Sequence, residues 1–331
     1  MIISVDCGST NMRCRLFDGK KLVDEVRKKA GVRNTAFDGT NTYLKESLRD
    51  CIADLLRRNL LKSGDVEVVI SAGTLSSDVG IYRVPHVKAP VGVFESAAHA
   101  KLVTLPEITD IPILFIPGVK TLPGNDVTDK MKQIEIWDSM SGEECEIYGI
   151  SEMLGLKGPF TITLPGSYNK ILRVDAEGKI TTMITGMCGE FIAAMSEHTL
   201  LKKSLPQPVI REIIPEKLKQ GFDFCAEHGV SPSLIKARMV RIHGGWSEDE
   251  AGNFFVGAIL IDDIRSIARS CGENDTLVIG GGDPLRSIFK ILIEHAEIPH
   301  KELKVVDDLS ARLASNVGSI KVYELFKQLN K

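Results

Sequence analysis

One short pattern occurs twice in this chain, and it restricts the available folds more than any other feature of the sequence. Gly8-Ser9-Thr10-Asn11 and Gly166-Ser167-Tyr168-Asn169 share the order Gly-Ser-x-Asn at an offset of 158 residues, close to half of the 331-residue chain. Each copy follows a strand-like apolar run, Ile2 to Val5 in the first case and Phe160 to Leu164 in the second. We therefore expect two related halves.

The residues after each copy extend the likeness. A second strand is predicted for Met12 to Phe17 and for Ile171 to Val174, and a third for Lys21 to Val26 and for Lys179 to Ile184. The turns between them contain Asp18-Gly19 and Glu177-Gly178. Asp-Gly is typical of a type I′ hairpin, in which both residues adopt positive φ. Each half is thus expected to open as strand, glycine turn, strand, tight turn, strand.

Helical patterns alternate with further strands along the rest of the chain. A helix is predicted from Tyr43 to Lys62, and a closing helix from Asp308 to Lys331, by apolar residues at helical spacing. Strands are predicted for three further runs, Val66 to Ser71, Ile111 to Ile116 and Thr276 to Ile279. The alternation predicts an α/β fold, and the length predicts two domains, residues 1–155 and 156–331.

Composition excludes several classes of protein. With 43% hydrophobic and 26% charged residues and a net charge of −3, the chain is typical of globular proteins and offers nucleic acid no general attraction. The apolar stretch from Phe254 to Ile261 is far shorter than the roughly 20 residues of a membrane span. Asp6 interrupts the N-terminus where a secretory signal would be apolar, so a cytoplasmic protein is expected. Seven scattered cysteines, without a Cys-x-x-Cys pair, predict neither disulfides nor a zinc site.

The repeated turns favour phosphate binding. A glycine turn leaves backbone N–H groups uncovered, and Ser or Thr hydroxyls beside them add donors, so Gly8, Ser9, Thr10 and Asn11 are candidate phosphate ligands. The same reasoning applies to the second copy, Gly166, Ser167, Tyr168 and Asn169. Either turn alone is more simply a tight hairpin; as a pair facing each other, they favour a grip on one triphosphate. The Asp6 carboxylate, at a strand end, is the candidate Mg²⁺ ligand.

A third glycine-rich segment follows the strand Thr276 to Ile279. Gly280, Gly281 and Gly282 would let a flat group such as a nucleotide's base and ribose approach the backbone, with the next helix N-terminus facing its phosphates. A flexible strand-to-helix loop is the alternative. Its place after the second phosphate turn favours the nucleotide.

Several segments in one order carry a resemblance to a known family. They are residues 6–13, 72–90, 116–118, 140–144 and 164–170, and Thr185-Gly186 with Glu190. In this order they resemble the actin and hexokinase superfamily and, within it, the 2-dehydro-3-deoxygalactonokinase family, which phosphorylates the terminal hydroxyl of a sugar acid with ATP and Mg²⁺. The resemblance implies a two-lobed, ribonuclease H-like fold with duplicated mixed sheets and a central cleft. Residues 1–155 would bind the sugar acid, and residues 156–331, with the closing helix 308–331, would bind ATP.

Three positions depart from the family pattern. Ser141 stands where the family usually has Arg, Ile81 where it has Trp, and Tyr168 where it has His. Because Ser cannot replace the two charge-assisted bonds of an Arg, the substrate stays open. The alternatives are another keto-sugar acid, a polyol, an amino sugar or pantothenate, or an ATP-binding regulator with weak catalysis. The oligomeric state is likewise open, with a homodimer among the options.

The resemblance also distributes the catalytic roles. Related sugar kinases place their catalytic carboxylate after a glycine, which makes Glu143 the expected base and Glu144 the second choice. Two acidic residues at a helix N-terminus are also favourable without any function. Arg13 is expected to reach a substrate carboxylate, and Ser77, Asp78 and Tyr82 to hold sugar hydroxyls.

Overall fold

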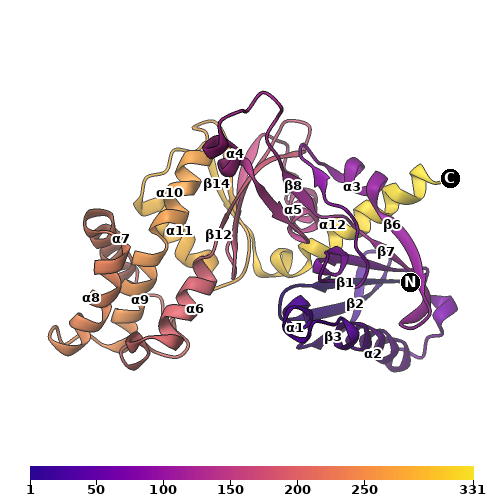
Figure 1. Ribbon diagram of the computed structural model, residues 1–331, viewed down its shortest axis with the longest axis horizontal. Helices are drawn as coiled ribbons and strands as arrows, with labels where there is room; N and C mark the ends of the chain where they lie inside the picture. Colours follow the sequence, from indigo (N-terminus) through magenta and orange to yellow (C-terminus); the bar gives the residue numbers. More distant parts are fainter. The chain divides into compact units, whose positions relative to one another are not determined.

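The computed structural model describes residues 1–331 and shows an α/β protein of two compact units (Figure 1). The first unit comprises Met1–Gly158, Asp175–Thr182 and Leu309–Lys331, and the second comprises Pro159–Val174 and Met183–Asp308. The first break between the two units, after Gly158, lies three residues beyond the domain boundary predicted after residue 155. The segment 175–182 and the closing helix, both expected in the C-terminal half, belong to the first unit. None of the helices combines the length and apolar character that crossing a membrane requires.

A six-stranded mixed sheet forms the centre of the first unit. Its order is β3-β2-β1-β4-β7-β6. These strands are β1 (Ile2–Cys7), β2 (Met12–Asp18), β3 (Lys21–Lys28), β4 (Val68–Gly73), β6 (Lys101–Leu105) and β7 (Thr109–Phe115). β1 pairs antiparallel with β2 and parallel with β4. All six residues of β4 are buried, as its run of apolar and small side chains predicts for a central strand.

Shorter elements complete this part of the chain. They are α1 (Val32–Asp38), α2 (Thr42–Arg58), the 3₁₀ turns η1 (Ser63–Asp65) and η2 (Thr74–Ser76), β5 (Val87–Lys88), α3 (Val93–His99), β8 (Val119–Thr121), α4 (Lys130–Ile136), β9 (Asp138–Met140) and α5 (Glu143–Leu154). The predicted amphipathic helix is α2, whose buried Leu44, Leu48 and Leu55 pack into the core with the β1–β2 hairpin. β5, β8 and β9 form a separate three-stranded sheet.

The closing helix α12 (Asp308–Leu329) packs on α5 within the first unit. Two glycines bring their backbones together: a Cβ on Gly149 would lie 1.8 Å from the Ala314 carbonyl oxygen, and one on Gly318 1.8 Å from that of Cys145. Polar contacts fasten α12 to the sheet, because Ser319 and Asn316 both hydrogen-bond to Ser4, at 3.1 and 2.8 Å. The helix is predicted from the sequence, but this position is not.

The second unit repeats the arrangement with a five-stranded sheet of order β12-β11-β10-β13-β14. Its strands are β10 (Phe160–Leu164), β11 (Asn169–Val174), β12 (Ile180–Gly186), β13 (Thr276–Ile279) and β14 (Glu302–Val305). β10 pairs antiparallel with β11 and parallel with β13, as β1 does with β2 and β4. The duplication predicted from Gly-Ser-x-Asn is therefore confirmed in the strand order.

Helices between β12 and β14 supply the second core. They are α6 (Cys188–His198), η3 (Leu200–Lys203), α7 (Pro215–His228), α8 (Val230–Ile242), α9 (Glu248–Ile259), α10 (Ile261–Ser270) and α11 (Leu285–His295). α9 has nine consecutive buried residues, because the apolar run from Phe254 to Ile261 passes through the centre of this core.

The hairpin turns differ from the predicted type I′ geometry. Positive φ occurs at Gly19 (56°) and Gly178 (78°), and not at Asp18 or Glu177. In the β2–β3 hairpin Asp18 still pairs with Lys21, so the loop is Gly19-Lys20, with glycine at the first central position as in a type II′ turn. The hairpins are thus confirmed, but the predicted turn type is wrong. The loop after β2 begins at Gly19, one residue later than predicted.

Candidate functional site

The first glycine turn exposes unused backbone donors. Gly8 N–H closes the turn on the Asn11 carbonyl at 3.0 Å, whereas the N–H groups of Ser9, Thr10 and Asn11 donate to no other group of the protein. Gly8, Thr10 and Asn11 are exposed, and the Asn11 amide donates to the Thr10 hydroxyl at 3.0 Å. Three free N–H groups and a hydroxyl on one turn are the donor set that a phosphate requires.

The carbonyl groups of this turn are held by the start of α1. Val32 and Arg33 N–H groups donate to the carbonyls of Gly8 and Ser9 at 3.3 and 2.9 Å. Gly31 makes this contact possible, because a Cβ there would lie 2.4 Å from the Ser9 carbonyl oxygen. The helix therefore orients the turn with its carbonyls inward and its N–H groups free.

Asp6 and Arg13 face each other across the first hairpin. They are register partners on β1 and β2, and Arg13 Nη1 lies 3.1 Å from Asp6 Oδ2. Both side chains are partly exposed, at 44% for Arg13 and 27% for Asp6. In this structure the Arg13 guanidinium thus forms an ion pair with the Asp6 carboxylate, which the sequence did not predict.

Backbone contacts through glycines bring three segments together at the end of β1. A Cβ on Gly73 would lie 2.5 Å from the Cys7 carbonyl oxygen, and one on Gly142 2.9 Å from Gly73 Cα. Both glycines have positive φ, 97° and 114°. The Thr74 hydroxyl adds hydrogen bonds to the carbonyls of Cys7 and Gly8, at 2.9 and 3.2 Å. The first turn, the end of β4 and the start of α5 are therefore neighbours.

The two candidate carboxylates occupy different environments at the start of α5. Glu144 is fully buried, and both of its oxygens accept the Gly142 N–H, at 2.9 and 2.8 Å. Glu143 is only partly buried and accepts the Ser141 N–H at 3.1 Å. Burial and the Glu144 charge raise the pKa of the adjacent Cys145 thiol, to which Asp6 also contributes. Glu143 is consequently the carboxylate with access to a ligand.

The predicted sugar-binding residues lie in the segment that follows β4. The Ser77 hydroxyl donates to the Thr74 carbonyl at 2.7 Å, and exposed Asp78 accepts the Val79 N–H at 3.1 Å. The Tyr82 ring stacks on buried Phe115 with a 5.2 Å centroid separation. Asp78 therefore presents a free face, while the Tyr82 ring belongs partly to the core.

The second glycine turn also exposes unused backbone donors. The N–H groups of Gly166, Ser167 and Tyr168 donate to no group of the protein. Its carbonyls are again held by a helix start: Glu190 N–H donates to Ser167 at 3.0 Å, and a Cβ on Gly189 would lie 2.4 Å from the Gly166 carbonyl oxygen. Gly189 follows Gly31 by the same 158 residues that separate the two turns, so the sequence itself contains a signal for this second pair of glycines.

The Asn169 side chain at the end of the second turn points into the core of the second unit. Its side chain is fully buried, accepts from the Thr163 hydroxyl at 2.8 Å and donates to Asp263 at 2.9 Å. Burial raises the pKa of Asp263, and burial together with Asp263 raises the pKa of Cys188 to about 12. The Asn169 side chain is thus not available to a phosphate, and its expected role as a ligand is wrong for the side chain.

The triple-glycine loop lies against the second turn. Gly280 N–H donates to the Thr163 carbonyl at 2.9 Å, and a Cβ on Gly281, whose φ is 68°, would lie 2.4 Å from the Pro165 carbonyl oxygen. Gly282 is exposed at the start of α11, where buried Arg286 pairs with Asp283 and Asp308. The triple-glycine loop therefore lies beside Thr163 and Pro165, the residues that lead into the second glycine turn.

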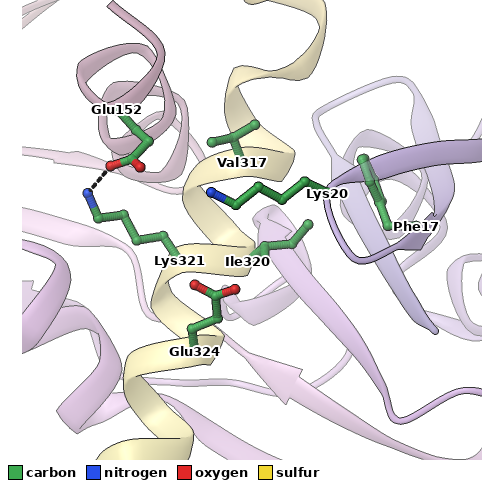
Figure 2. A pocket seen from close by; sticks show the side chains of 7 residues that line it. All are labelled: Phe17, Lys20, Glu152, Val317, Ile320, Lys321 and Glu324. Carbon is green, nitrogen blue, oxygen red and sulfur yellow. Dashed lines mark hydrogen bonds and ion pairs between the residues drawn. The ribbon is translucent and has the colours of Figure 1, made fainter. Parts of the chain in front are cut away.

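Two cavities contain none of the predicted site residues. A cavity of about 70 Å³ in the first unit is shown in Figure 2, where Lys321 faces Glu152 at 2.6 Å and Lys20 extends toward α12. A cavity of about 450 Å³ in the second unit is apolar and lies between α6, η3 and α8, lined by Phe191, Met195 and Leu234 among others. In the two glycine turns, the exposed residues are Gly8, Thr10, Asn11, Ser167 and Tyr168.

The donor set around Asp6 fits Mg²⁺. Mg²⁺ in phosphate-transfer sites keeps several waters and takes one or two carboxylates beside the substrate phosphates. Asp6 supplies one partly exposed carboxylate next to the free N–H groups of the first turn. No group of three or more His, Cys, Asp or Glu side chains forms a complete metal cage in residues 1–331.

Most of the chain matches the model of one protein family. The model of the 2-keto-3-deoxy-galactonokinase family matches residues 6–315. The 2-dehydro-3-deoxygalactonokinase of Escherichia coli strain K12 is 22% identical over 292 residues, which are 87% of each chain.

Two solved structures share the architecture. A candidate 2-dehydro-3-deoxygalactonokinase from Sinorhizobium meliloti superposes with a TM-score of 0.75 at 19% identity over 98% of both chains. The activator of 2-hydroxyisocaproyl-CoA dehydratase from Clostridium difficile, solved with bound ADPNP, reaches a TM-score of 0.51 at 13% identity, over 99% of this chain and 97% of that one. The fold is actin- and hexokinase-like, as the sequence predicted.

Proposed function

Because the chain belongs to the 2-keto-3-deoxy-galactonokinase family, and is therefore a sugar kinase, we propose that it phosphorylates the terminal hydroxyl of 2-dehydro-3-deoxygalactonate with ATP. The observation that carries the proposal is the contact of Gly142 with Gly73 and of Gly73 with Cys7. Glu143 follows Gly142 directly, so this contact supports a role for its carboxylate near the first glycine turn.

Glu143 is assigned as the general base. A carboxylate that accepts the proton of the attacking hydroxyl contributes about 10²- to 10⁴-fold to the rate of such a reaction. Glu143 has the exposure for this role, whereas Glu144 spends both oxygens on the Gly142 N–H and is buried. We therefore assign Glu144 a positioning role at the start of α5.

Phosphate binding is assigned to each glycine turn within its own unit. Ser9, Thr10 and Asn11 in the first unit, and Gly166, Ser167 and Tyr168 in the second, have free N–H groups. The triple-glycine loop beside the second turn is assigned to the base and ribose. Support comes from the ADPNP held by the dehydratase activator, a protein of the same fold.

Asp6 would hold Mg²⁺, which when bound neutralises charge on the phosphates. Arg13 would orient Asp6 through their 3.1 Å ion pair, and its exposed guanidinium also suits the carboxylate of the sugar acid. Ser77 and Asp78 are assigned to the sugar hydroxyls.

The test is an acceptor screen. Purified protein is incubated with Mg-ATP and a panel of keto-deoxy sugar acids, aldonic acids, polyols, amino sugars and pantothenate, and ADP release is followed. We expect turnover of 2-dehydro-3-deoxygalactonate, with the product phosphorylated at its terminal hydroxyl. ATP binding with slow turnover, indifferent to every acceptor, would instead favour a regulatory protein.

The first predicted variant effect belongs to the same experiment. Glu143→Gln should lower kcat about 100-fold or more while leaving nucleotide affinity within about twofold, because the amide cannot accept the proton. Isothermal titration with ADPNP measures the affinity. Loss of ADPNP binding in the folded variant would contradict the assignment of Glu143 as base.

A further inference from the structure

A histidine outside the predicted site contacts Ser141, two residues before Glu143. His86 lies immediately before β5, and its Nε2 shares a hydrogen bond of 3.0 Å with the Ser141 hydroxyl. The imidazole is half-buried. Nothing in the proposed reaction yet uses this side chain.

The backbone around His86 is shaped to accept its ring. A Cβ on Gly118 would lie 2.6 Å from His86 Cδ2, 2.7 Å from its Nε2 and 2.3 Å from the Met140 carbonyl oxygen. The three-stranded sheet fixes these neighbours: Val87 N–H donates to the Gly118 carbonyl at 2.9 Å, and Val119 pairs with Met140. The ring is therefore held between Gly118 and Ser141.

Ser141 links the imidazole to the assigned base. Its hydroxyl contacts His86, while its N–H donates to the Glu143 carboxylate at 3.1 Å. One residue thus couples both side chains, and the next residue, Gly142, is fixed by its contact with Gly73. Ser141 therefore contacts both side chains, His86 through its hydroxyl and Glu143 through its backbone N–H.

The charges around His86 keep its ring neutral near pH 7. Burial lowers the pKa of His86, and so do Lys120 on β8 and Arg83 before β5. Asp78 and a hydrogen bond with the Met140 backbone oppose this shift without reversing it. A neutral imidazole has one N–H and one acceptor nitrogen, so with Ser141 it offers hydrogen bonds but no positive charge.

We propose that His86 is a positioning residue and a specificity determinant of the acceptor site. Together with Ser141, it forms an uncharged hydrogen-bonding pair beside Glu143 that selects a hydroxyl or keto group. The acceptor's carboxylate would be bound elsewhere, because a carboxylate favours a cationic partner that this pair does not supply. This inference rests on the proposed kinase function.

The test compares His86→Ala, His86→Asn, Ser141→Ala and the double variant, with exposed His243→Asn as the matched control. We expect His86→Ala to raise the acceptor KM about 3- to 10-fold, the range of one neutral hydrogen bond, with the ATP KM unchanged. His86→Asn should recover part of the loss, because its amide can donate or accept. The double variant should be no worse than His86→Ala alone, since both substitutions break one contact.

A second acceptor separates specificity from structure. Against an analogue whose keto group is reduced to a hydroxyl, the wild-type preference for the keto acid should change in His86→Ala and return toward wild-type values in His86→Asn. Equal KM values and preferences in wild type and all His86 variants would overturn the inference while leaving the kinase function intact. Additive losses in the double variant, with the ATP KM raised, would overturn it in favour of a structural role.

Failure of the proposed function has a different signature. Wild-type protein that neither turns over nor binds any keto-deoxy acid, measured by titration in the presence of ADPNP, overturns both proposals. Turnover by wild type together with unchanged His86 variants overturns only the role of His86.

Discussion

Some glycines are required not for a positive φ but because another backbone segment lies too close for a Cβ. Gly31 and Gly189 leave room for the carbonyls of the two glycine turns, at positions where a Cβ would lie 2.4 Å away. Contacts this short involve backbone atoms, which cannot rotate aside as a side chain would. A methyl group must therefore displace the turn.

Gly31→Ala should raise the KM for ATP at least about tenfold, because the displaced turn no longer aligns its free N–H groups, and a tenfold effect corresponds to about 1.4 kcal/mol. Steady-state kinetics with varied ATP measures it. Gly64→Ala is the control, since a Cβ there has nothing within 4 Å. An unchanged KM for ATP in a folded Gly31→Ala protein would remove the first turn from the nucleotide site.

At the scale of elements, a buried arginine joins the first hairpin to α12. The Arg15 side chain is 3% exposed and donates to Glu25 on β3, to the Arg312 carbonyl at 2.9 Å and to Asn316. Burial alone would raise the pKa of Glu25, but hydrogen bonds from Arg15 and Arg27 outweigh it and lower the pKa to about 2. Ionised Glu25 therefore stabilises the folded chain.

The stabilisation by Glu25 should depend on pH in a defined window. It is present in full above the ordinary carboxyl pKa of about 4.5 and is lost as the pH falls toward 2, because the unfolded chain takes up the proton first. The contribution is on the order of 3 kcal/mol. Urea denaturation between pH 3 and 7 should show a flatter dependence for Glu25→Gln than for wild type.

The same variant should be less stable at pH 7 by about 3 to 5 kcal/mol, since it leaves the Arg15 charge buried without its carboxylate partner. Asp18→Asn, an exposed change on the same hairpin, is the control. Equal stability of Glu25→Gln and wild type at pH 7 would show that the ion pair contributes nothing.

At the scale of the whole molecule, the first unit is assembled from three separate stretches of chain. The last of them contains α12, whose Asn316 and Ser319 are buried against Ser4 and whose backbone touches α5 at Gly149. The N-terminal stretch alone therefore lacks part of its own core.

Removal of residues 309–331 should lower the apparent unfolding temperature by at least about 10 °C, since each kcal/mol lost shifts it by about 2–4 °C in domains of this size. Differential scanning calorimetry measures the change. Removal of Asn330 and Lys331 alone, which follow α12, is the control. A truncated chain that unfolds like the full one would show that α12 is dispensable for the first unit.

Local pattern was enough to predict much of this protein. The strand–turn–strand order, the α/β class and the duplication are encoded in short runs, because apolar periodicity and glycine turns act over a few residues. Gly8 to Asn11 and Gly166 to Tyr168 could be chosen as candidate ligands for the same reason. Glu143 and Arg13 were chosen only through the family resemblance.

Contacts between distant segments were decided by the tertiary structure alone. Asn169 matches Asn11 in the sequence, yet it is buried beneath its turn because Asp263, 94 residues later, takes its amide. His86 gained its place beside Ser141 from the pairing of β5, β8 and β9, and α12 joined the first unit through glycine contacts with α5. Sequence periodicity shows which face of an element is buried, whereas the partner that covers that face depends on packing of the whole chain.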